Sequence, residues 1–381
     1  MSQGGPLAGL RVVDFTWAAM GPYAGYLLAG LGAEVIQVSR PLKATANSTT
    51  ASITRFFDVG KTCIRVNVKE LGGKKILHDL IDKSDIFLEN FRPGVIEGLG
   101  FDYETLSQTN KNLVMISGSA LGRGGQESGY VGYAPIFSAL SGLADLTGFE
   151  DGRPTEIRYP CDLTSGALMA FAAIAGVANL KRREGSYVDL AARDALLWTL
   201  TSSFALSGKA INHRKGNNHE TIFPHGVYRC AGEDQWVTIA ARDNRQRQAL
   251  FQLIGYTAGH VADTDSLSNQ DRAAVESAIT AWASSLDTEK AVATLQSQGV
   301  SAFASVDAKD IWQDKHLRCR HFFQYTTDVG WVASPPWFLQ GGRAAISHNG
   351  DASSARERVF SGILGLNSEA IEALLIEGVL G

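Results

Sequence analysis

The feature that most constrains the fold is an alternation of short apolar runs with helix-like segments. Residues 10–15 and 34–38 have the composition of buried strands, and residues 23–31 between them favour a helix. A strand, a helix and a strand at this spacing predict a parallel pair. The same alternation predicts further strands at 63–68, 86–90, 113–117 and 187–190. Helices are predicted at 72–83, from Tyr103, at 136–146 and at 193–206. We therefore predict an α/β fold whose large, Rossmann-like domain has a doubly wound parallel sheet.

The first turn of this predicted domain differs from that of dinucleotide-binding proteins. Residues 16–21 read Thr-Trp-Ala-Ala-Met-Gly, and the glycine fingerprint GxGxxG is missing. The glycines of that fingerprint let the backbone approach a pyrophosphate closely. The sequence therefore predicts the Rossmann-like fold without a dinucleotide site.

The length of the chain and a change of texture near residue 210 predict a second domain. A chain of 381 residues exceeds what one hydrophobic core usually supports. Beyond residue 225 the pattern changes to a hairpin, several helices and a strand at 301–306, which is typical of a smaller α/β domain. We predict four segments: a large domain over 1–208, a linker or flap over 209–225, a small domain over 226–325, and a return to the large domain over 326–381.

Composition excludes several classes of function. The net charge is −4, which argues against a broad nucleic-acid-binding surface. The four cysteines, Cys63, Cys161, Cys230 and Cys319, form no CxxC pair, so neither a metal site nor a disulfide framework is indicated. The N-terminus lacks the features of a signal peptide. We expect a cytoplasmic protein with no metal, no nucleic acid and no membrane among its partners.

The segment that follows Asp162 is the longest apolar stretch. Residues 167–180 favour helix, and the basic residues 181–183 suit a helix C-terminus. Gly176 and Asn179 interrupt the stretch, so we predict a buried core helix rather than a membrane span. An Asp directly before such a run is a helix-start signal. Two roles stay open for Asp162 from the local pattern: an N-cap, or a nucleophilic carboxylate at the mouth of a buried helix.

Several motifs along the chain occur together in one known family. Each is weak alone, but their order and spacing are specific. They lie at residues 10–15 with Gly21-Pro22, at 31–36, 85–94, 98–103 and 141–143, in the Asp162 stretch 159–166, and at 185–190. With these motifs the sequence resembles the class III CoA-transferases, the family of formyl-CoA transferase and carnitine CoA-transferase, over nearly the whole chain.

The resemblance implies a reaction and a set of site residues. Asp162 falls on the position of the family's nucleophile, which would attack an acyl-CoA thioester to give a mixed anhydride and then an aspartyl-CoA thioester. Arg40, Lys69, Asn90 and Phe91 fall on positions that contact CoA. From the residues alone, Arg40 and Lys69 are equally consistent with solvated surface charges, and Phe91 with core packing. The family also implies two interlocked chains, with CoA and acyl-CoA as substrates and no metal.

The departures from the family pattern concern the acyl group. Ala19 stands where formyl-CoA transferases have a Gln, and residues 217–223 replace their glycine-rich flap. Gly98 stands where many members carry a cation. Tyr133 lies in the segment that supplies the base in the superfamily's racemases, and a phenol with a pKa of about 10 is unsuited to that task. These differences argue against formyl or oxalate specificity and against racemase activity.

Two motifs resemble those of succinyl-CoA-dependent members. They are residues 14–17 and residues 224–230, the latter containing His225. That branch acts on dicarboxylic or aryl- and alkylsuccinate acids, so His225 and Arg242 are candidates to contact a distal carboxylate, the alternative for His225 being a turn residue. We predict a CoA-transferase with succinyl-CoA as donor, working as a homodimer or with a related subunit. The alternatives are an acyl-CoA racemase or isomerase, and the non-catalytic subunit of a heteromeric transferase.

Overall fold

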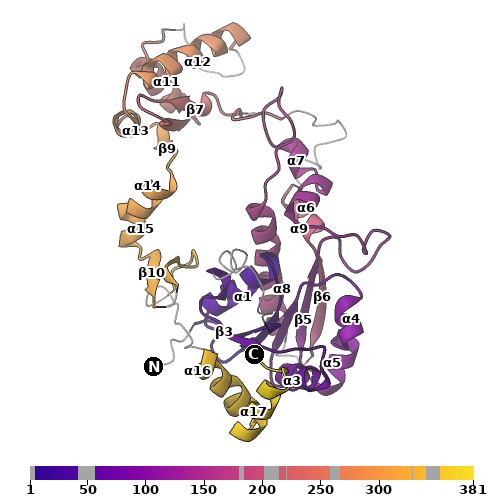
Figure 1. Ribbon diagram of the computed structural model, residues 1–381. Coiled ribbons are helices and arrows are strands. Elements are labelled where there is room, and N and C mark those ends of the chain that lie inside the picture. Colours follow the sequence, from indigo (N-terminus) through magenta and orange to yellow (C-terminus); the bar gives the residue numbers. More distant parts are fainter. Residues whose placement is uncertain are drawn as a thin grey trace. The chain divides into compact units, whose positions relative to one another are not determined.

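The computed structural model describes residues 5–41, 56–179, 184–200, 214–219, 221–257, 267–327, 329–339 and 352–381. The chain divides into two compact units (Figure 1). The first contains Met1–Ala144, Glu156–Ile211 and His316–Gly381, and the second contains Asp145–Thr155 and Asn212–Lys315. The domain boundaries predicted at 208, 225 and 325 stay predictions. Residues 209–213 of the predicted flap lie outside the described residues.

The first unit is built on a six-stranded sheet in the order β3-β2-β1-β4-β5-β6. All of its neighbouring strands are parallel, which confirms the predicted doubly wound sheet. The apolar runs form the strands because a parallel sheet is covered on both faces. The strands are β1 (Arg11–Phe15), β2 (Glu34–Ser39), β3 (Thr62–Arg65), β4 (Ile86–Glu89), β5 (Val114–Ser119) and β6 (Ser186–Ala191).

Helices cover both faces of this sheet, and the strand residues alternate between two hydrophobic cores. Val12 packs into one core and Val13 into the other, as the period of two along a strand requires. The first core holds α1 (Met20–Gly30), α6 (Ala134–Leu140), α8 (Tyr159–Asn179) and α9 (Ala192–Thr199). The second holds α3 (Leu71–Asp82), α4 (Val95–Leu99), α5 (Tyr103–Thr109), α16 (Ala352–Arg356), the π-helical turn Glu357–Ile363 and α17 (Ser368–Ile376).

Two predicted helices differ from those observed. The single helix expected near 136–146 is two, α6 and α7 (Leu143–Leu146), because Gly142 between them has a φ of +81°. Helix α9 ends at Thr199, and the remaining residues of its predicted range, 201–206, lie outside the described residues, as do 180–183.

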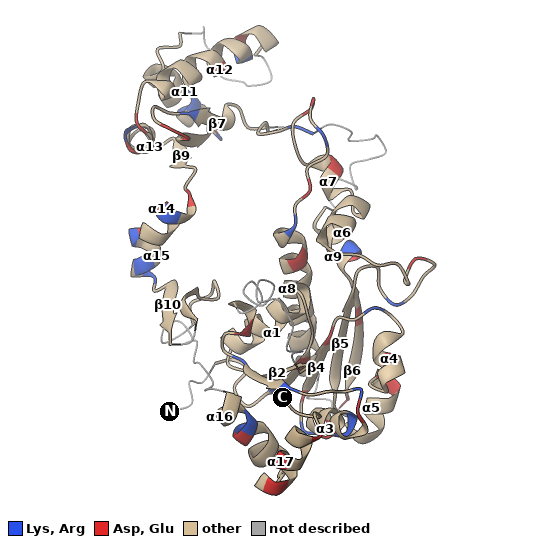
Figure 2. Cartoon of the chain, viewed as in Figure 1, with Lys and Arg blue, Asp and Glu red and all other residues tan. Residues whose placement is uncertain are grey.

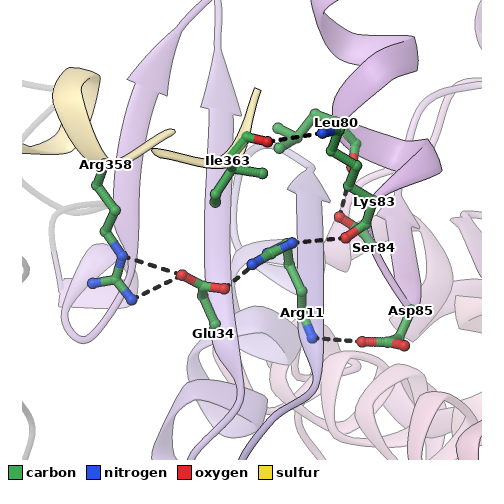
Figure 3. A network of polar contacts seen from close by, with 8 residues as sticks. All are labelled: Arg11, Glu34, Leu80, Lys83, Ser84, Asp85, Arg358 and Ile363. Carbon is green, nitrogen blue, oxygen red and sulfur yellow. Dashed lines mark hydrogen bonds and ion pairs between the residues drawn. The ribbon is translucent and has the colours of Figure 1, made fainter. Parts of the chain in front are cut away.

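The C-terminal residues return to the first unit at the amino-terminal edge of the sheet. Arg11 at the start of β1 donates from Nε to Glu34 Oε2 at 2.8 Å, and Arg358 donates to the other oxygen of Glu34 at 2.8 Å (Figure 3). Lys83 Nζ donates to the carbonyl of Ile363 at 3.0 Å. A short hairpin, β10 (Phe323–Thr326) and β11 (Gly330–Ala333), reaches α1, where Tyr26 Oη donates to the carbonyl of Ala333.

The second unit has an antiparallel sheet in the order β7-β8-β9. Its core joins sheet residues such as Val237 and Ile239 to Val275, Ile279 and Leu295 of the helices. Arg214 ties residues 145–155 to this unit by donating to Asp145, Phe149 and Gly152. The elements are β7 (His225–Arg229), β8 (Trp236–Ala240), β9 (Ser301–Ala304), α11 (Asn244–Leu253), α12 (Asn269–Ser284), α13 (Thr288–Ser297) and α14 (Ala308–Gln313), with α15 (Lys315–Cys319) at the boundary.

Candidate active site

Asp162 lies inside the first turn of α8, so the predicted N-cap role is wrong. The helix begins at Tyr159, three residues before Asp162, and the Asp162 N–H donates to the carbonyl of Arg158 at 3.4 Å. Pro160 explains the earlier start, because proline fits the first turn of a helix, where its missing N–H is not needed. The carboxylate remains close to the positive end of the helix dipole, which stabilises an anion.

The Asp162 carboxylate is partly buried and has no polar partner among the residues that the structure describes. Burial raises its pKa from 3.8 to about 6, because water that would stabilise the charge is excluded. Asp162 is the only charged residue within Tyr159–Asn179, and Figure 2 draws almost all of α8 in tan. This carboxylate is therefore ionised at neutral pH and makes no ion pair with any residue in the described ranges.

A close contact between α8 and α1 places Asp162 at the carboxyl edge of the sheet. A Cβ added to Gly166 would lie 2.3 Å from the carbonyl oxygen of Met20, the first residue of α1. Asp162 precedes Gly166 by four residues, so it lies on the same helix face and about 6 Å further along the axis. It is therefore beside the loop of residues 16–19, which leads from β1 into α1.

The same edge contains the point where the strand order reverses. The chain proceeds from β1 to β2 on one side and from β4 to β5 on the other, and β1 pairs with β4. Asn90, directly after β4, bonds the backbone of Trp17: its Oδ1 accepts from the Trp17 N–H and its Nδ2 donates to the Trp17 carbonyl, both at 2.9 Å. Ligands of open α/β sheets bind in the crevice at this switch point.

Aromatic contacts connect Trp17 to further predicted site residues. The rings of Trp17 and Tyr133 lie 6.2 Å apart and nearly perpendicular, and both side chains are about half exposed. Ala19 is the N-cap of α1, and Tyr133 that of α6. Phe91 packs its ring 4.9 Å from that of Phe15, as the core-packing alternative requires. Ala19, Asn90 and Tyr133 thus lie around the loop of residues 16–19, and Asp162 lies on the face of α8 that contacts Met20, the residue directly after this loop.

The remaining predicted residues lie elsewhere. Arg40 follows β2 and Lys69 lies between β3 and α3; both are exposed at the carboxyl edge. His225 begins β7 in the second unit, where its Nδ1 lies 2.6 Å from the carbonyl of Asn217 and its ring 5.4 Å from that of His219. In the same unit, the Arg242 N–H donates to Gln246 at 2.9 Å. Within the described ranges, no three His, Cys, Asp or Glu side chains are grouped closely enough to hold a metal ion.

Sequence reasoning missed Trp17, which joins Asn90 to Tyr133, and the residues that support its loop. Those residues are Asp14 on β1 and Lys61, whose side chains form a fully buried ion pair. One signal was available: Asp14 interrupts an apolar strand, and a buried carboxylate requires a partner. The identity of that partner was hidden, because Lys61 lies 47 positions away in the sequence.

The model of CoA-transferase family III matches residues 7–349. The chain is 32% identical to acetyl-CoA:oxalate CoA-transferase of Acetobacter aceti over 292 residues, 73% of this chain and 74% of that protein. It is 29% identical to succinyl-CoA:mesaconate CoA-transferase of Haloarcula marismortui, covering 86% and 87% of the two chains. It is 26% identical to succinyl-CoA–D-citramalate CoA-transferase of Chloroflexus aurantiacus, covering 98% of each.

A solved structure has the same fold. The crystal structure of a CAIB/BAIF family protein from Brucella suis superposes with a TM-score of 0.80 at 24% identity, covering 94% of this chain and all of that one. The family match covers most of the described fold, including both strands that flank the switch point and helix α8. By this match and these relatives, the chain belongs to CoA-transferase family III.

Proposed function

We propose that this CoA-transferase moves CoA from succinyl-CoA to a dicarboxylic acid or an aryl- or alkylsuccinate, with Asp162 as the nucleophile. The observation that carries the proposal is the Asp162 carboxylate, which is partly buried and has no partner in the described ranges, beside the switch point of the sheet. With a pKa of about 6 the group is about nine-tenths ionised at pH 7. A desolvated anion is a stronger nucleophile than a hydrated one.

The reaction proceeds through four exchanges that conserve charge. An Asp162 oxygen attacks the thioester carbonyl carbon, and the C–S bond breaks, which gives the mixed anhydride and free CoA thiolate. The thiolate attacks the Asp162 carbonyl carbon and releases the donor acid as a carboxylate. The acceptor carboxylate then attacks the aspartyl-CoA thioester and expels the thiolate again. Attack of that thiolate on the acceptor's acyl carbon gives the new thioester and restores Asp162.

The CoA moiety is assigned to the carboxyl edge of β2, β3 and β4. Arg40 and Lys69 are exposed there and supply cations for phosphate groups. Asn90 and Phe91 follow β4, although Asn90 also supports Trp17 and Phe91 packs on Phe15. We assign Ala19 and Tyr133 to the acyl group because both adjoin the loop beside Asp162. We propose that His225 contacts a distal carboxylate of the substrate.

The choice of acids rests on relatives. The Haloarcula and Chloroflexus proteins named above use succinyl-CoA with mesaconate or D-citramalate, while the Acetobacter protein uses acetyl-CoA with oxalate. Ala19 and the 217–223 segment distinguish this chain from formyl-type members, which favours succinyl-CoA as donor. A further relative from Chloroflexus, 30% identical to this chain, is the alpha subunit of succinyl-CoA–L-malate CoA-transferase.

A second chain, identical or related, completes the proposed enzyme, which we place in the cytoplasm. Large apolar side chains are exposed on the helices of the first unit, including Phe171 on α8 at 65% and Trp198 on α9 at 68%. Residues Tyr159–Ala178 are long and apolar enough to span a membrane, but core helices have the same composition. A partner chain accounts for the exposed apolar surface, and we propose the interlocked arrangement typical of the family.

The test uses the purified chain, a panel of acyl-CoA donors and carboxylic acids, and mass spectrometry of the CoA esters. Hydroxylamine is added to enzyme with donor alone, and the modified residue is identified by peptide mapping. We expect a hydroxamate on Asp162 and none on Asp194, an exposed aspartate in the first turn of α9 that serves as the control. Modification elsewhere, or activity of wild-type level in Asp162→Ala, would contradict the nucleophile assignment.

Two further measurements test the alternatives. A racemase exchanges the α-proton of an acyl-CoA with deuterium from the solvent, whereas a transferase has no need to remove it. Exchange without transfer of CoA would replace our proposal. A chain that is inactive alone and active only with a co-purified related chain would indicate a heteromeric enzyme, and hydroxylamine labelling then identifies which subunit carries the nucleophile.

A further inference from the structure

A buried ion pair lies beneath α1, on the sheet face that α1 covers. Lys61 Nζ lies 2.7 Å from Asp14 Oδ2, and both side chains are fully buried. The same ammonium donates to the carbonyl of Pro22 in α1 at 2.7 Å and to Gln37 Oε1 on β2 at 3.3 Å. Asp14 and Gln37 are register partners on adjacent strands. One cation therefore connects β1, β2 and the first turn of α1 with the start of β3.

The second oxygen of Asp14 connects this pair to the loop beside Asp162. Asp14 Oδ1 accepts a short hydrogen bond from the hydroxyl of Thr16, the first residue of that loop. Thr16 is buried, and its side chain lies against Gly21, where an added Cβ would come within 2.4 Å. Two sets of hydrogen bonds thus hold the loop: the Thr16 hydroxyl bonds to Asp14, and the Asn90 side chain bonds to the backbone of Trp17.

Helix α1 packs closely against the ion pair at Gly25. A Cβ added to Gly25 of α1 would lie 2.2 Å from Asp14 Oδ2 and 2.9 Å from Lys61 Nζ. The helix approaches the two charges closely because this residue has no side chain. The contact with the pair therefore determines how closely α1 approaches the sheet. The distance between α1 and the sheet in turn determines the position of Met20 and of the loop that precedes it.

Stability alone is a weak reason for this arrangement. Replacing a buried ion pair by apolar side chains of similar volume is often neutral or stabilising, because desolvation of the charges offsets their attraction. The geometry points to a second role: we propose that Asp14 and Lys61, acting through Thr16, are positioning residues that hold the loop of residues 16–19 in register with Asp162 for the transfer reaction. This inference rests on the proposed function of Asp162.

The expected kinetic signature follows from the location of the loop. It adjoins Asp162 and the assigned acyl site, whereas Arg40 and Lys69, assigned to CoA, lie after β2 and β3. A displaced loop misaligns the thioester and the carboxylate without removing CoA contacts. A misplacement of about 1 Å lowers a rate by about 10²-fold. The loss should therefore appear in kcat, while KM for the donor stays within about twofold.

The first test compares Thr16→Val with Thr16→Ser. Valine keeps the shape of threonine without the hydroxyl, and serine keeps the hydroxyl. We expect Thr16→Val to lower kcat and the rate of Asp162 trapping by about 10²-fold, and Thr16→Ser to retain activity within about threefold. Thr105→Val is the matched control, because Thr105 makes a similar bond, 2.9 Å to Asp102, at the start of α5. Equal kcat values for the valine and serine variants at position 16 would overturn the proposal.

The second test removes both charges together, in Asp14→Leu with Lys61→Met. No uncompensated charge remains, so we expect a folded protein by circular dichroism and thermal melting, with kcat reduced as in Thr16→Val. A folded double variant with wild-type kcat would also overturn the proposal; if it does not fold, the position-16 pair decides. Absence of CoA transfer by the wild-type protein, both alone and together with any co-purified related chain, would instead refute the proposed function, so the two failures are distinguishable.

Discussion

The carboxylates at the two edges of the parallel sheet differ in ion pairing and in pKa. At the amino edge, Glu34 accepts from Arg11 and Arg358; burial raises the pKa of Glu34, but these cations lower it overall (Figure 3). At the carboxyl edge, Asp162 is partly buried, has no partner in the described ranges, and has a raised pKa of about 6. The carboxylate at the amino edge joins chain segments, whereas the one at the carboxyl edge is the nucleophile in the proposed mechanism.

The difference between the two edges shows how pairing and burial affect the reactivity of a carboxylate. A paired carboxylate is stabilised in its ionised form and is poorly nucleophilic, whereas an unpaired and desolvated one is destabilised and reactive. The buried Asp14 is a third case near the same edge, fully paired with Lys61. Substitutions at these three positions should therefore separate effects on activity from effects on stability.

The largest contrast is expected between Asp162→Ala and Glu34→Ala. Loss of the nucleophile should lower kcat by about 10⁴-fold or more, because no other group in the proposed mechanism forms the anhydride. Glu34→Ala should keep kcat within about twofold, since Glu34 lies at the opposite edge of the sheet. Steady-state transfer assays on the two variants measure the contrast. Comparable losses of kcat in the two variants would contradict the prediction that only the carboxylate at the carboxyl edge takes part in the reaction.

Lys61→Met alone should be the most destabilising of these changes. It leaves the Asp14 carboxylate buried without its partner, which typically costs about 3–5 kcal/mol in free energy of unfolding. Denaturant titration followed by circular dichroism measures the loss. The double variant with Asp14→Leu should regain most of the lost free energy of unfolding. If the single variant were as stable as the double, the Asp14 carboxylate would not be buried without a partner in the absence of Lys61.

Gly166→Ala tests the contact that places Asp162. The added Cβ would lie 2.3 Å from the Met20 carbonyl, so α8 must move away from α1. We expect a loss of about 1–3 kcal/mol in stability together with a lower kcat. The control is Gly98→Ala, since nothing lies within 4 Å of a Cβ added to Gly98 on α4. Equal behaviour of the two variants would mean that the α1–α8 contact does not position the carboxylate.

The pH dependence should follow the raised pKa of Asp162. In the proposed mechanism the ionised form of Asp162 is the nucleophile, so kcat should rise about tenfold per pH unit below pH 6 and level off above it. The sign for stability is the reverse: a carboxyl whose pKa is raised by folding stabilises the protein at low pH and loses that contribution as pH rises through about 6. Asp162→Asn should therefore raise the melting temperature more at pH 8 than at pH 5. A pH-independent difference would contradict the assignment of the titration to Asp162.

Much of the sheet could be predicted from local pattern, but the site could not be assembled from it. Strands β1, β4 and β5 are mostly buried along their length and β3 alternates between buried and exposed residues, and both patterns indicate a strand. The start of α8 was misplaced because Pro160 and Asp162 both signal a helix N-terminus, and the proline takes the earlier position. The Asp14–Lys61 pair and the Asn90–Trp17 bonds join residues 47 and 73 positions apart, and no local pattern encodes such pairings.

The smallest effect is expected at the amino edge, from Arg358→Ala. Arg358 is about half exposed, and its bonds to Glu34 are screened by water and salt. An exposed ion pair contributes about 0.2–1 kcal/mol, so the variant should lose no more than about 1 kcal/mol, and less at high ionic strength. Arg11 continues to neutralise Glu34, which limits the loss further. Transfer activity should be unchanged, because stability at this edge and reactivity at the other depend on different charges. A change in kcat measured with unchanged stability would mean that the two edges are coupled through the sheet.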